Sequence, residues 1–310
     1  IVIDGVFTID NYFRIFQCPN IRFGAEAQIV LANGATLSIE NSQLRAACNV
    51  MWKGIKANHI SQTVQISKNS VLRDMRIGIE ICGNVVFEAP MLKCEASSFI
   101  DNLQSITFQN TPANYSGNVW SCKFETSTSP ALMLAPYTKM RRAISIFNCR
   151  GLEIGGLYGS TTILGNKFKH VENGIYVEGN NSLSVLQMNI RLYNNVFEKI
   201  QGGKEIHDGN MTITNNVFTS DKGCAIFAKN TSKFLYKANI HLWIDYLNPP
   251  LGIQFADCSK AIVTSNVHVD CKNAIMDKVN AGCINTLADN RSYQFVNNVI
   301  AGTLYGIAVT

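Results

Sequence analysis

Charged residues are scarce in this chain of 310 residues, at 16% of the total against about a quarter in an ordinary globular protein. The net charge is +5, and the longest basic run is the short segment Lys139-Met-Arg-Arg142. Proteins that bind nucleic acid carry a basic cluster or stripe, which this sequence lacks, so no nucleic-acid partner is predicted. No apolar run approaches the roughly 18 residues of a membrane-spanning helix, so none is expected.

Several motifs that announce a cofactor are also missing. The 10 cysteines form no Cys-x-x-Cys pair, which argues against a zinc site. The glycines of Gly151-Leu-Glu-Ile-Gly155-Gly156 lack the spacing of a dinucleotide fingerprint. What the chain has in abundance is asparagine, 33 residues, beside 22 Gly and only 7 Pro. Because Asn is poor in helix interiors and tolerates left-handed backbone, this composition predicts short strands joined by Asn-rich turns.

A frame of apolar positions repeats along the chain. In its clearest copy, Asn166 at position zero is followed by Phe168 at plus two, Gly174 at plus eight, and Ile175 and Val177 at plus nine and plus eleven. Full copies begin at Ser70, Ser97, Asn216 and Asn298, and partial copies at Ser42, Cys122, Asn148, Asn195, Asn239 and Asn266. Apolar residues two apart follow the period of a strand. The mean spacing is about 26 residues, 256 residues over ten intervals.

Such a unit cannot bury its apolar face alone, but stacked units can. The pattern therefore predicts an all-β fold, a right-handed parallel β-helix (a solenoid) of about twelve coils. Side chains at position zero should stack as a ladder in which each Asn amide bonds its neighbours above and below. Two buried columns are expected, one of isoleucines and one of phenylalanines: Ile79, Ile106, Ile175, Ile275 and Ile307, and Phe99, Phe124, Phe168, Phe197 and Phe218.

We expect residues 1–310 to form a single β-helix domain, with shorter N-terminal coils over 1–57 and regular coils over 58–310. The chain is interpreted as part of something longer. Residues 304–310 resemble a strand without a polar cap, so further chain or another subunit is expected to continue the solenoid end to end.

The N-terminal coils carry a resemblance to a known group. Gly34-Ala-Thr-Leu-Ser-Ile39, followed by Cys48-Asn-Val-Met-Trp52-Lys-Gly54-Ile55, resembles secreted right-handed β-helix proteins of the Bacteroidota type. The wider group is the pectate-lyase-like β-helix superfamily. This resemblance covers nearly the whole chain and implies a secreted or cell-surface location, often within a long surface protein.

Enzymes of that superfamily carry recognisable catalytic sets, which this sequence does not complete. No adjacent Asp-Asp pair occurs, and Trp243-Ile-Asp245-Tyr246 has tyrosine where the pectate-lyase element has histidine. The register offers another candidate pair: Asp74 and Asp101 share position plus four of consecutive coils, about 5 Å apart at the spacing of parallel strands. Three interpretations stay open for them, namely turn residues, an ion site, and the carboxylate pair of a glycosidase.

Metal ligands are the third kind of candidate. Asp245 matches the calcium-binding aspartate of the pectate-lyase element, and Glu205-Ile-His207-Asp208-Gly209 gathers ligand types, His207 and Asp208 above all, in a predicted loop. A metal needs three or four convergent ligands, which one loop does not supply. No cofactor is predicted, and calcium is the ion these oxygens would take. The cysteines are expected to be mostly reduced and buried; the alternatives are a Cys18–Cys48 link or one within Cys258, Cys271 and Cys283.

Two hypotheses of function follow. The first is a non-catalytic, exported or cell-surface module: a rigid spacer, an adhesin shaft or a glycan-contacting rod whose partners are polysaccharides or other surface and assembly proteins. The second is a polysaccharide lyase or glycoside hydrolase acting in a groove along the β-helix. Because no complete catalytic set is present, we favour the first. An outward aromatic row would favour carbohydrate binding, and its candidates are Tyr115, Trp120, Tyr137, Tyr158, Tyr176, Tyr193 and Tyr236.

Overall fold

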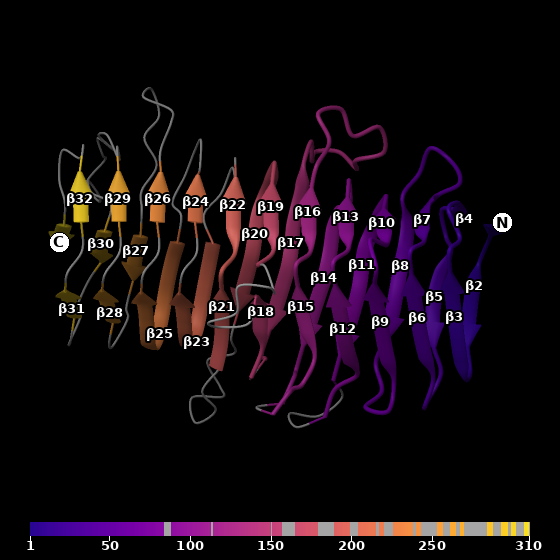
Figure 1. Cartoon of the computed structure of the whole chain (residues 1–310), viewed down its shortest axis with the longest axis horizontal. Coiled ribbons are helices and arrows are strands. Elements are labelled where there is room, and N and C mark those ends of the chain that lie inside the picture. The colour runs from indigo at the N-terminus through magenta and orange to yellow at the C-terminus, as the bar shows by residue number, and fades with distance from the viewer. Residues whose placement is uncertain are drawn as a thin grey trace.

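The computed structural model describes the side chains of residues 1–83, 88–112, 114–149, 151–156, 165–177 and 190–197, and beyond these the backbone of strands alone. The strands pair in parallel and stack in rows along the long axis, with the two termini at opposite ends (Figure 1). No helix in the described residues is long and apolar enough to cross a membrane.

One row of short strands forms a 12-stranded sheet, here called sheet A. Its strands are β1 (Val2–Ile3), β4 (Ile21–Phe23), β7 (Gln43–Ala46), β10 (Val71–Arg73), β13 (Ser98–Ile100), β16 (Lys123–Glu125), β19 (Lys167–Lys169), β22 (Val196–Glu198), β24 (Val217–Thr219), β26 (Ile240–Leu242), β29 (Val267–Val269) and β32 (Val299–Ala301).

The other strands form two further ladders, B1 and B2, which share the long strands β23 (Lys204–Thr214) and β25 (Ile226–Lys237). The rest of B1 is β2 (Val6–Ile9), β5 (Gln28–Leu31), β8 (Trp52–Ala57), β11 (Met75–Cys82), β14 (Gln104–Gln109), β17 (Met140–Phe147), β20 (Val171–Glu178), β27 (Ile253–Ala256), β30 (Ile284–Leu287) and β33 (Ile307–Val309). The rest of B2 is β3 (Tyr12–Phe16), β6 (Thr36–Glu40), β9 (Thr63–Ser67), β12 (Met91–Glu95), β15 (Asn118–Trp120), β18 (Glu153–Gly155), β21 (Asn189–Tyr193), β28 (Ala261–Thr264) and β31 (Tyr293–Val296).

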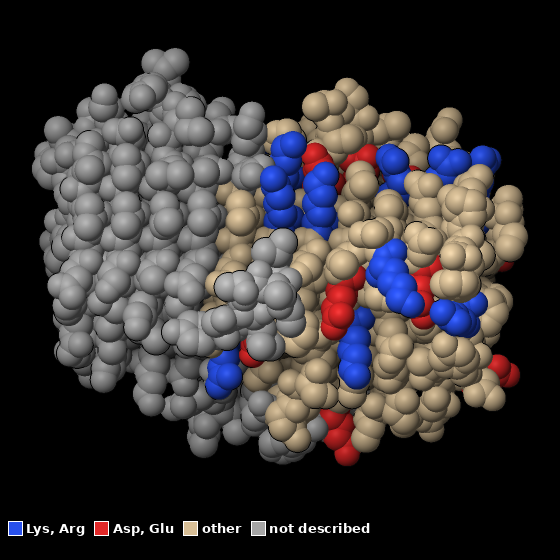
Figure 2. Space-filling view, viewed as in Figure 1, with Lys and Arg blue, Asp and Glu red and all other residues tan. Residues whose placement is uncertain are grey.

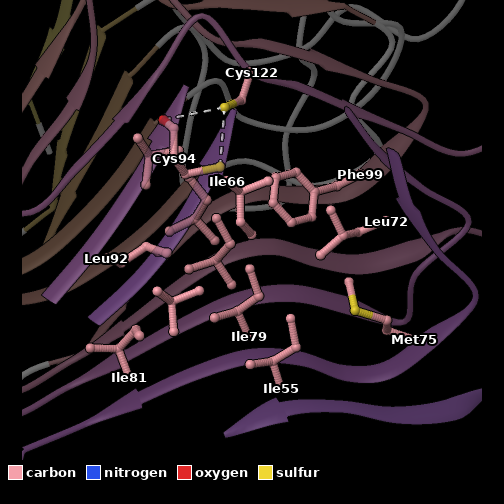
Figure 3. Packing of buried hydrophobic residues seen from close by; sticks show 14 of the residues in the cluster. Ile55, Ile66, Leu72, Met75, Ile79, Ile81, Leu92, Cys94, Phe99 and Cys122 are labelled. Carbon is pink, nitrogen blue, oxygen red and sulfur yellow. Dashed lines mark hydrogen bonds between the residues drawn. The ribbon is translucent and has the colours of Figure 1, made fainter. Parts of the chain in front are cut away.

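The predicted columns form the core. In sheet A, Phe99 lies opposite Phe124, Phe124 opposite Phe168 and Phe168 opposite Phe197. These four rings are fully buried and stack face to face, with centroids 4.9, 5.0 and 4.6 Å apart. In B1, Ile79, Ile106 and Ile175 share a buried column, as predicted. Figure 3 shows aliphatic side chains of successive coils converging in this core. Phe218 and Ile307 are placed by backbone register only, and Ile275 lies outside the described residues.

At six corners of the described coils, the chain turns into sheet A through a residue with left-handed backbone. Asn194 at this place has φ +56° and Asn195 follows at position zero, so the two asparagines of the pair have different roles. The first is favoured because Asn tolerates positive φ. The same conformation recurs at Gln17, Asn41, Asn69, Ala96 and Ser121.

The ladder at position zero differs in detail from the prediction. The Asn166 carboxamide is fully buried, but it bonds the backbone of the preceding coil rather than another amide. The N–H of Cys122 donates to Asn166 Oδ1 over 2.8 Å, and Asn166 Nδ2 donates to the Val119 carbonyl over 2.8 Å. The prediction of amide-to-amide bonds is wrong here because the corner interrupts the strand ladders, and its buried N–H and C=O groups need partners.

Between β16 and β19 the repeat contains an insertion, and the sequence frame wrongly placed the start of a separate coil there. Strand β16 pairs directly with β19, so Phe124 and Phe168 are neighbours although 44 residues separate them. Asn148, interpreted as the start of a coil, instead follows β17 with φ +51°, in the turn before β18. From Ile21 to Ile300 the sheet-A positions advance 279 residues over ten intervals, about 28 per coil. The predicted count of about twelve coils stays a prediction, because side-chain packing is described only for the N-terminal coils.

Candidate functional site

The structure brings the predicted pair Asp74 and Asp101 together at one corner. Both follow a strand of sheet A, and both have left-handed backbone, with φ of +59° and +55°. His170, at the same position of a later coil, has φ +52°. Aspartate tolerates this conformation better than most residues. The geometry of the corner therefore supports the interpretation of Asp74 and Asp101 as turn residues.

Arg73, which the sequence frame does not single out, lies between the two carboxylates. Arg73 Nη2 donates to Asp101 Oδ2 over 2.9 Å, and Arg73 Nε lies 3.3 Å from Asp74 Oδ2. Asp101 also accepts from Ser127, over 2.7 Å from its N–H and 3.0 Å from its hydroxyl. With three protein donors on Asp101, the cation that balances this pair is a guanidinium. A catalytic role for the two aspartates stays a prediction.

Burial controls the electrostatics of this corner. Asp74 is only 7% exposed and Asp101 only 2%. Loss of solvent raises the pKa of Asp74, as does the nearby charge of Asp101, while the charge of Arg73 and a hydrogen bond from the Ala46 backbone act to lower it. The folded state therefore holds the charged form of Asp74 at a cost.

This cost predicts the behaviour of the Asp74→Asn variant. Asparagine keeps the shape and tolerates the left-handed turn, but it carries no charge to desolvate. Because the folded pKa of Asp74 is raised, the stability of the wild type relative to this variant is greatest at low pH and falls as pH rises through that pKa. We expect the variant to be at least as stable as the wild type at pH 7 and to lose this advantage in acid. Urea unfolding at pH 7 and pH 3 measures it; a clearly less stable variant at pH 7 would contradict the argument.

The predicted metal ligands fall in another part of the chain. Asp245 lies outside the described residues, and His207 and Asp208 belong to β23, where only the backbone is described. The prediction that residues 205–209 form a loop is wrong, because they continue a strand of 11 residues. Within the part of the chain whose side chains are described, no group of three or more His, Cys, Asp or Glu side chains could hold a metal ion.

A pocket of about 290 Å³ opens on the outer face of ladder B2. It lies over β15 and β18, beside the segment 114–117 that leads into β15. We call it the Trp120 pocket, and its main lining residues are Tyr115, Asn118, Trp120, Glu153 and Arg191. Side chains of these strands alternate, so while Val119 and Ile154 point into the core, their neighbours face outward.

Two outward rows cross this face. The first runs Lys93, Asn118, Glu153 and Arg191 on four consecutive strands, and the second runs Glu95, Trp120, Gly155 and Tyr193. Gly155 lies between the two aromatic residues in this row. Its φ is +126°, and a Cβ there would overlap the Tyr193 carbonyl oxygen, so no other residue fits. Aromatic rings and charged groups of both signs therefore lie on the outer face beside the pocket.

Two polar atoms of the pocket wall are buried without a hydrogen-bond partner in the described structure. They are the acceptor Asn118 Oδ1 and the donor Trp120 Nε1. The amide of Asn118 is oriented by its other end, because Asn118 Nδ2 donates to Glu95 Oε1 over 3.0 Å. Asn118 is 8% exposed. An unpaired buried group costs free energy, so a ligand that reaches these two atoms with one acceptor and one donor would be favoured here.

Tyr115 shapes the wall beside these atoms. Its hydroxyl oxygen accepts the N–H of Leu92 over 2.8 Å, which ties the segment before β15 to strand β12. Burial raises the pKa of Tyr115 above its usual range, so the phenol stays neutral at physiological pH. Gly117 allows the ring to lie close, since a Cβ at this position would overlap it.

The charges on the visible face are few and mixed. Figure 2 shows acidic and basic side chains interspersed on the described part of this face, with no continuous basic stripe. Sheet A adds a local cluster in which Glu125 pairs with Lys123 and with Lys169, the latter over 3.5 Å. Exposed pairs of this kind contribute little stability.

The architecture and its stacked columns define a parallel β-solenoid protein. The family model described as "Right handed beta helix region" matches residues 143–310, more than half of the chain. The chain therefore belongs to the right-handed β-helix family, which confirms the predicted fold and its handedness.

Two solved structures match this chain at low similarity. One is the Streptococcus pneumoniae surface protein and adhesin PfbA, 12% identical, with a TM-score of 0.32 over 99% of this chain and 92% of that one. The other is the catalytic domain of a GH87 alpha-1,3-glucanase in complex with nigerose, 12% identical, with a TM-score of 0.25 over 100% of this chain and 63% of that one. No curated protein matches the sequence.

Proposed function

We propose that this chain is a non-catalytic, exported or cell-surface module that contacts glycans through the Trp120 pocket. The observation that carries the proposal is the pairing of an outward indole with two unsatisfied buried polar atoms, Asn118 Oδ1 and Trp120 Nε1. A sugar ring offers both an apolar C–H face and hydroxyl groups that donate and accept. One hydroxyl can accept from the indole N–H, and a second can donate to the amide oxygen.

The surroundings fit an extended ligand. Trp120 and Tyr193 lie two strands apart, about 10 Å at the spacing of parallel strands, with Gly155 between them. A chain of sugars that runs along the solenoid could contact both rings. Lys93, Glu153 and Arg191 add polar groups of both signs beside this path. The rigid stack of coils holds these groups in fixed positions, which lowers the cost of ordering them on binding.

A second candidate function is glycoside hydrolysis or polysaccharide cleavage in the same place. The observation that favours it is the presence of two carboxylates, Glu95 and Glu153, on strands on either side of β15. Hydrolysis requires two carboxyl groups placed across one glycosidic bond. Because Glu95 accepts a hydrogen bond from Asn118, its structural contact is to the pocket wall. This contact favours binding over turnover.

The expected effect of Trp120→Ala is a loss of glycan affinity of about tenfold or more, because stacking and one hydrogen bond disappear together. The measurement is titration calorimetry of the purified chain with pectate, alginate, chondroitin and neutral glucans, with and without calcium. Tyr12→Ala is the matched control, since Tyr12 is an exposed aromatic on the first B2 strand. Thermal unfolding checks that both variants remain folded.

The outcomes separate the two functions. Binding that is weakened by Trp120→Ala and unaffected by Tyr12→Ala supports the glycan-contacting module. Release of reducing or unsaturated sugar ends, abolished by Glu95→Gln or Glu153→Gln, would move the enzyme to first place. Activity abolished by Asp74→Asn or Asp101→Asn would do the same and would assign the chemistry to the corner pair. Absence of binding to every glycan would contradict the assignment to this pocket.

A further inference from the structure

Two inward columns meet at the corner between B2 and sheet A. The B2 column is aliphatic on every described coil except one: Ile15, Ile39, Ile66, Cys94, Val119, Ile154 and Leu192. The corner column at position zero consists of small polar side chains and a cysteine: Ser42, Ser70, Ser97, Cys122, Asn166 and Asn195. Cys18, three residues before Ile21, continues it into the first coil, where its N–H donates to Ser42 Oγ.

At Ser42, Ser70, Asn166 and Asn195, the corner side chain donates to a carbonyl of the B2 column in the coil before it. Ser70 Oγ donates to the Ile39 carbonyl over 3.2 Å, and Asn195 Nδ2 donates to the Ile154 carbonyl over 3.1 Å. The interface between the coils of β12 and β15 has different side chains. Cys122 stands where the other corners have serine or asparagine, and it contacts Cys94, which stands where the other B2 strands have an aliphatic residue.

The two sulfur atoms are in contact. Cys94 Sγ lies 3.5 Å from Cys122 Sγ, and Cys122 Sγ lies 3.5 Å from the Cys94 carbonyl (Figure 3). Both side chains are buried, at 0% and 1% exposure. All six described cysteines are free thiols, and this is the one pair among them in sulfur contact. A disulfide bond of about 2.0 Å requires the sulfurs to approach by about 1.5 Å, within reach of small side-chain rotations.

We propose that Cys94 and Cys122 are a modification site, at which a low-molecular-weight disulfide oxidises the pair to an inter-coil disulfide. The thiolate of one cysteine attacks the oxidant, forms a mixed disulfide and releases one small thiol. The second cysteine loses its proton and attacks the mixed disulfide, which forms the Cys94–Cys122 bond and releases the second small thiol. Two protein thiols are oxidised and one small disulfide is reduced, so atoms and electrons balance. The bond joins β12 to the corner that follows β15.

The burial of the pair sets the conditions for the reaction. Burial and the neighbouring Cys122 thiol raise the pKa of Cys94, so little thiolate is present at neutral pH. Exchange is therefore expected to be faster at alkaline pH, and faster when a mild denaturant opens the coil. Once closed, the bond is shielded from reducing thiols by the same burial.

The test treats the purified chain with oxidised glutathione at pH 8.5, once in buffer alone and once at a urea concentration below the unfolding transition, beside a sample kept in reduced glutathione. After an acid quench, the chain is unfolded, alkylated and digested without reduction. We expect a cross-linked pair of peptides containing Cys94 and Cys122. The mass of this pair should be lower by two hydrogen atoms than the summed masses of the two peptides with free thiols. The thermal midpoint of the oxidised sample should rise, because the bond constrains the unfolded chain.

Two variants and one control make the result specific. Cys94→Val and Cys122→Ser introduce side chains found at the equivalent positions of neighbouring coils, Val119 and Ser97, so both should fold. Each should abolish the cross-link and the rise in midpoint. Cys149→Ser, which removes another buried thiol, should leave both intact. Complete alkylation of Cys94 and Cys122 after both oxidising treatments would overturn the proposal, as would a cross-link of either residue to a different cysteine.

Discussion

Replacement of Phe124 by alanine is expected to lower the free energy of unfolding by about 3–5 kcal/mol. Phe124 lies in the middle of the stacked column, with ring centroids 4.9 Å from Phe99 and 5.0 Å from Phe168. Its side chain is fully buried. Alanine would leave a cavity between two rings that the backbone ladder holds at fixed spacing, so the coils cannot close onto it.

Urea unfolding followed by circular dichroism measures this effect. Phe16→Ala is the matched control, because Phe16 is 43% exposed and contacts only the guanidinium of Arg14 among ring partners in the described coils. Its loss should cost about 1 kcal/mol or less. Similar losses from the two substitutions would show that the column is not a tightly packed core.

The sequence predicts this column because each phenylalanine lies two residues after a corner residue, even though the coils differ in length. Phe99, Phe124, Phe168 and Phe197 occupy the same place in the frame and pair in register. What the frame could not predict is the insertion between β16 and β17. Asn148 has positive φ and precedes a buried side chain, as does Asn194 at the corner that leads into sheet A. An asparagine of this kind therefore occurs at more than one corner of a coil. Local turn chemistry therefore locates corners without saying which corner each one is.

The candidate sites, too, were predictable only in part from the sequence. The register placed Asp74 and Asp101 on one face, as found, because parallel strands translate sequence frames into spatial columns. The frame did not include Arg73, although it directly precedes Asp74, since whether its head reaches a neighbouring coil depends on side-chain conformation. Trp120 and Tyr193 were candidates for an outward row, and their shared position two residues before a corner residue, Cys122 or Asn195, was the available signal. The unsatisfied state of Asn118 Oδ1 follows only from coordinates.

Replacement of Arg73 by methionine is expected to destabilise the fold by about 2–4 kcal/mol at pH 7. Removal of one partner from a buried ion pair leaves an uncompensated charge, which costs about 3–5 kcal/mol. The cost is lower here because the Arg73 side chain is 33% exposed and solvent screens part of its charge. The remaining penalty is large because Asp74 and Asp101 would face each other at 7% and 2% exposure with no cation between them.

The pH dependence distinguishes this cause from lost packing. Burial already raises the pKa of Asp74, and Arg73 opposes that increase, so its removal should raise the pKa further. Stability held by a group with a raised folded pKa is present at low pH and is lost as pH rises through that pKa. The deficit of Arg73→Met relative to wild type should therefore shrink as pH falls from 7 towards 3, whereas a packing defect would not respond to pH.

Arg14→Met is the control for this experiment. Arg14 also pairs with a glutamate of the next coil, with 3.1 Å between Arg14 Nη2 and Glu40 Oε2, but its side chain is 42% exposed. Its loss should change the free energy of unfolding little, because solvent screens this exposed pair. Calcium provides the last comparison, because an ion site at this corner would compete with Arg73. Calcium should leave the unfolding midpoint of the wild type unchanged. A rise in the wild-type midpoint with calcium would instead assign Asp74 and Asp101 to an ion site.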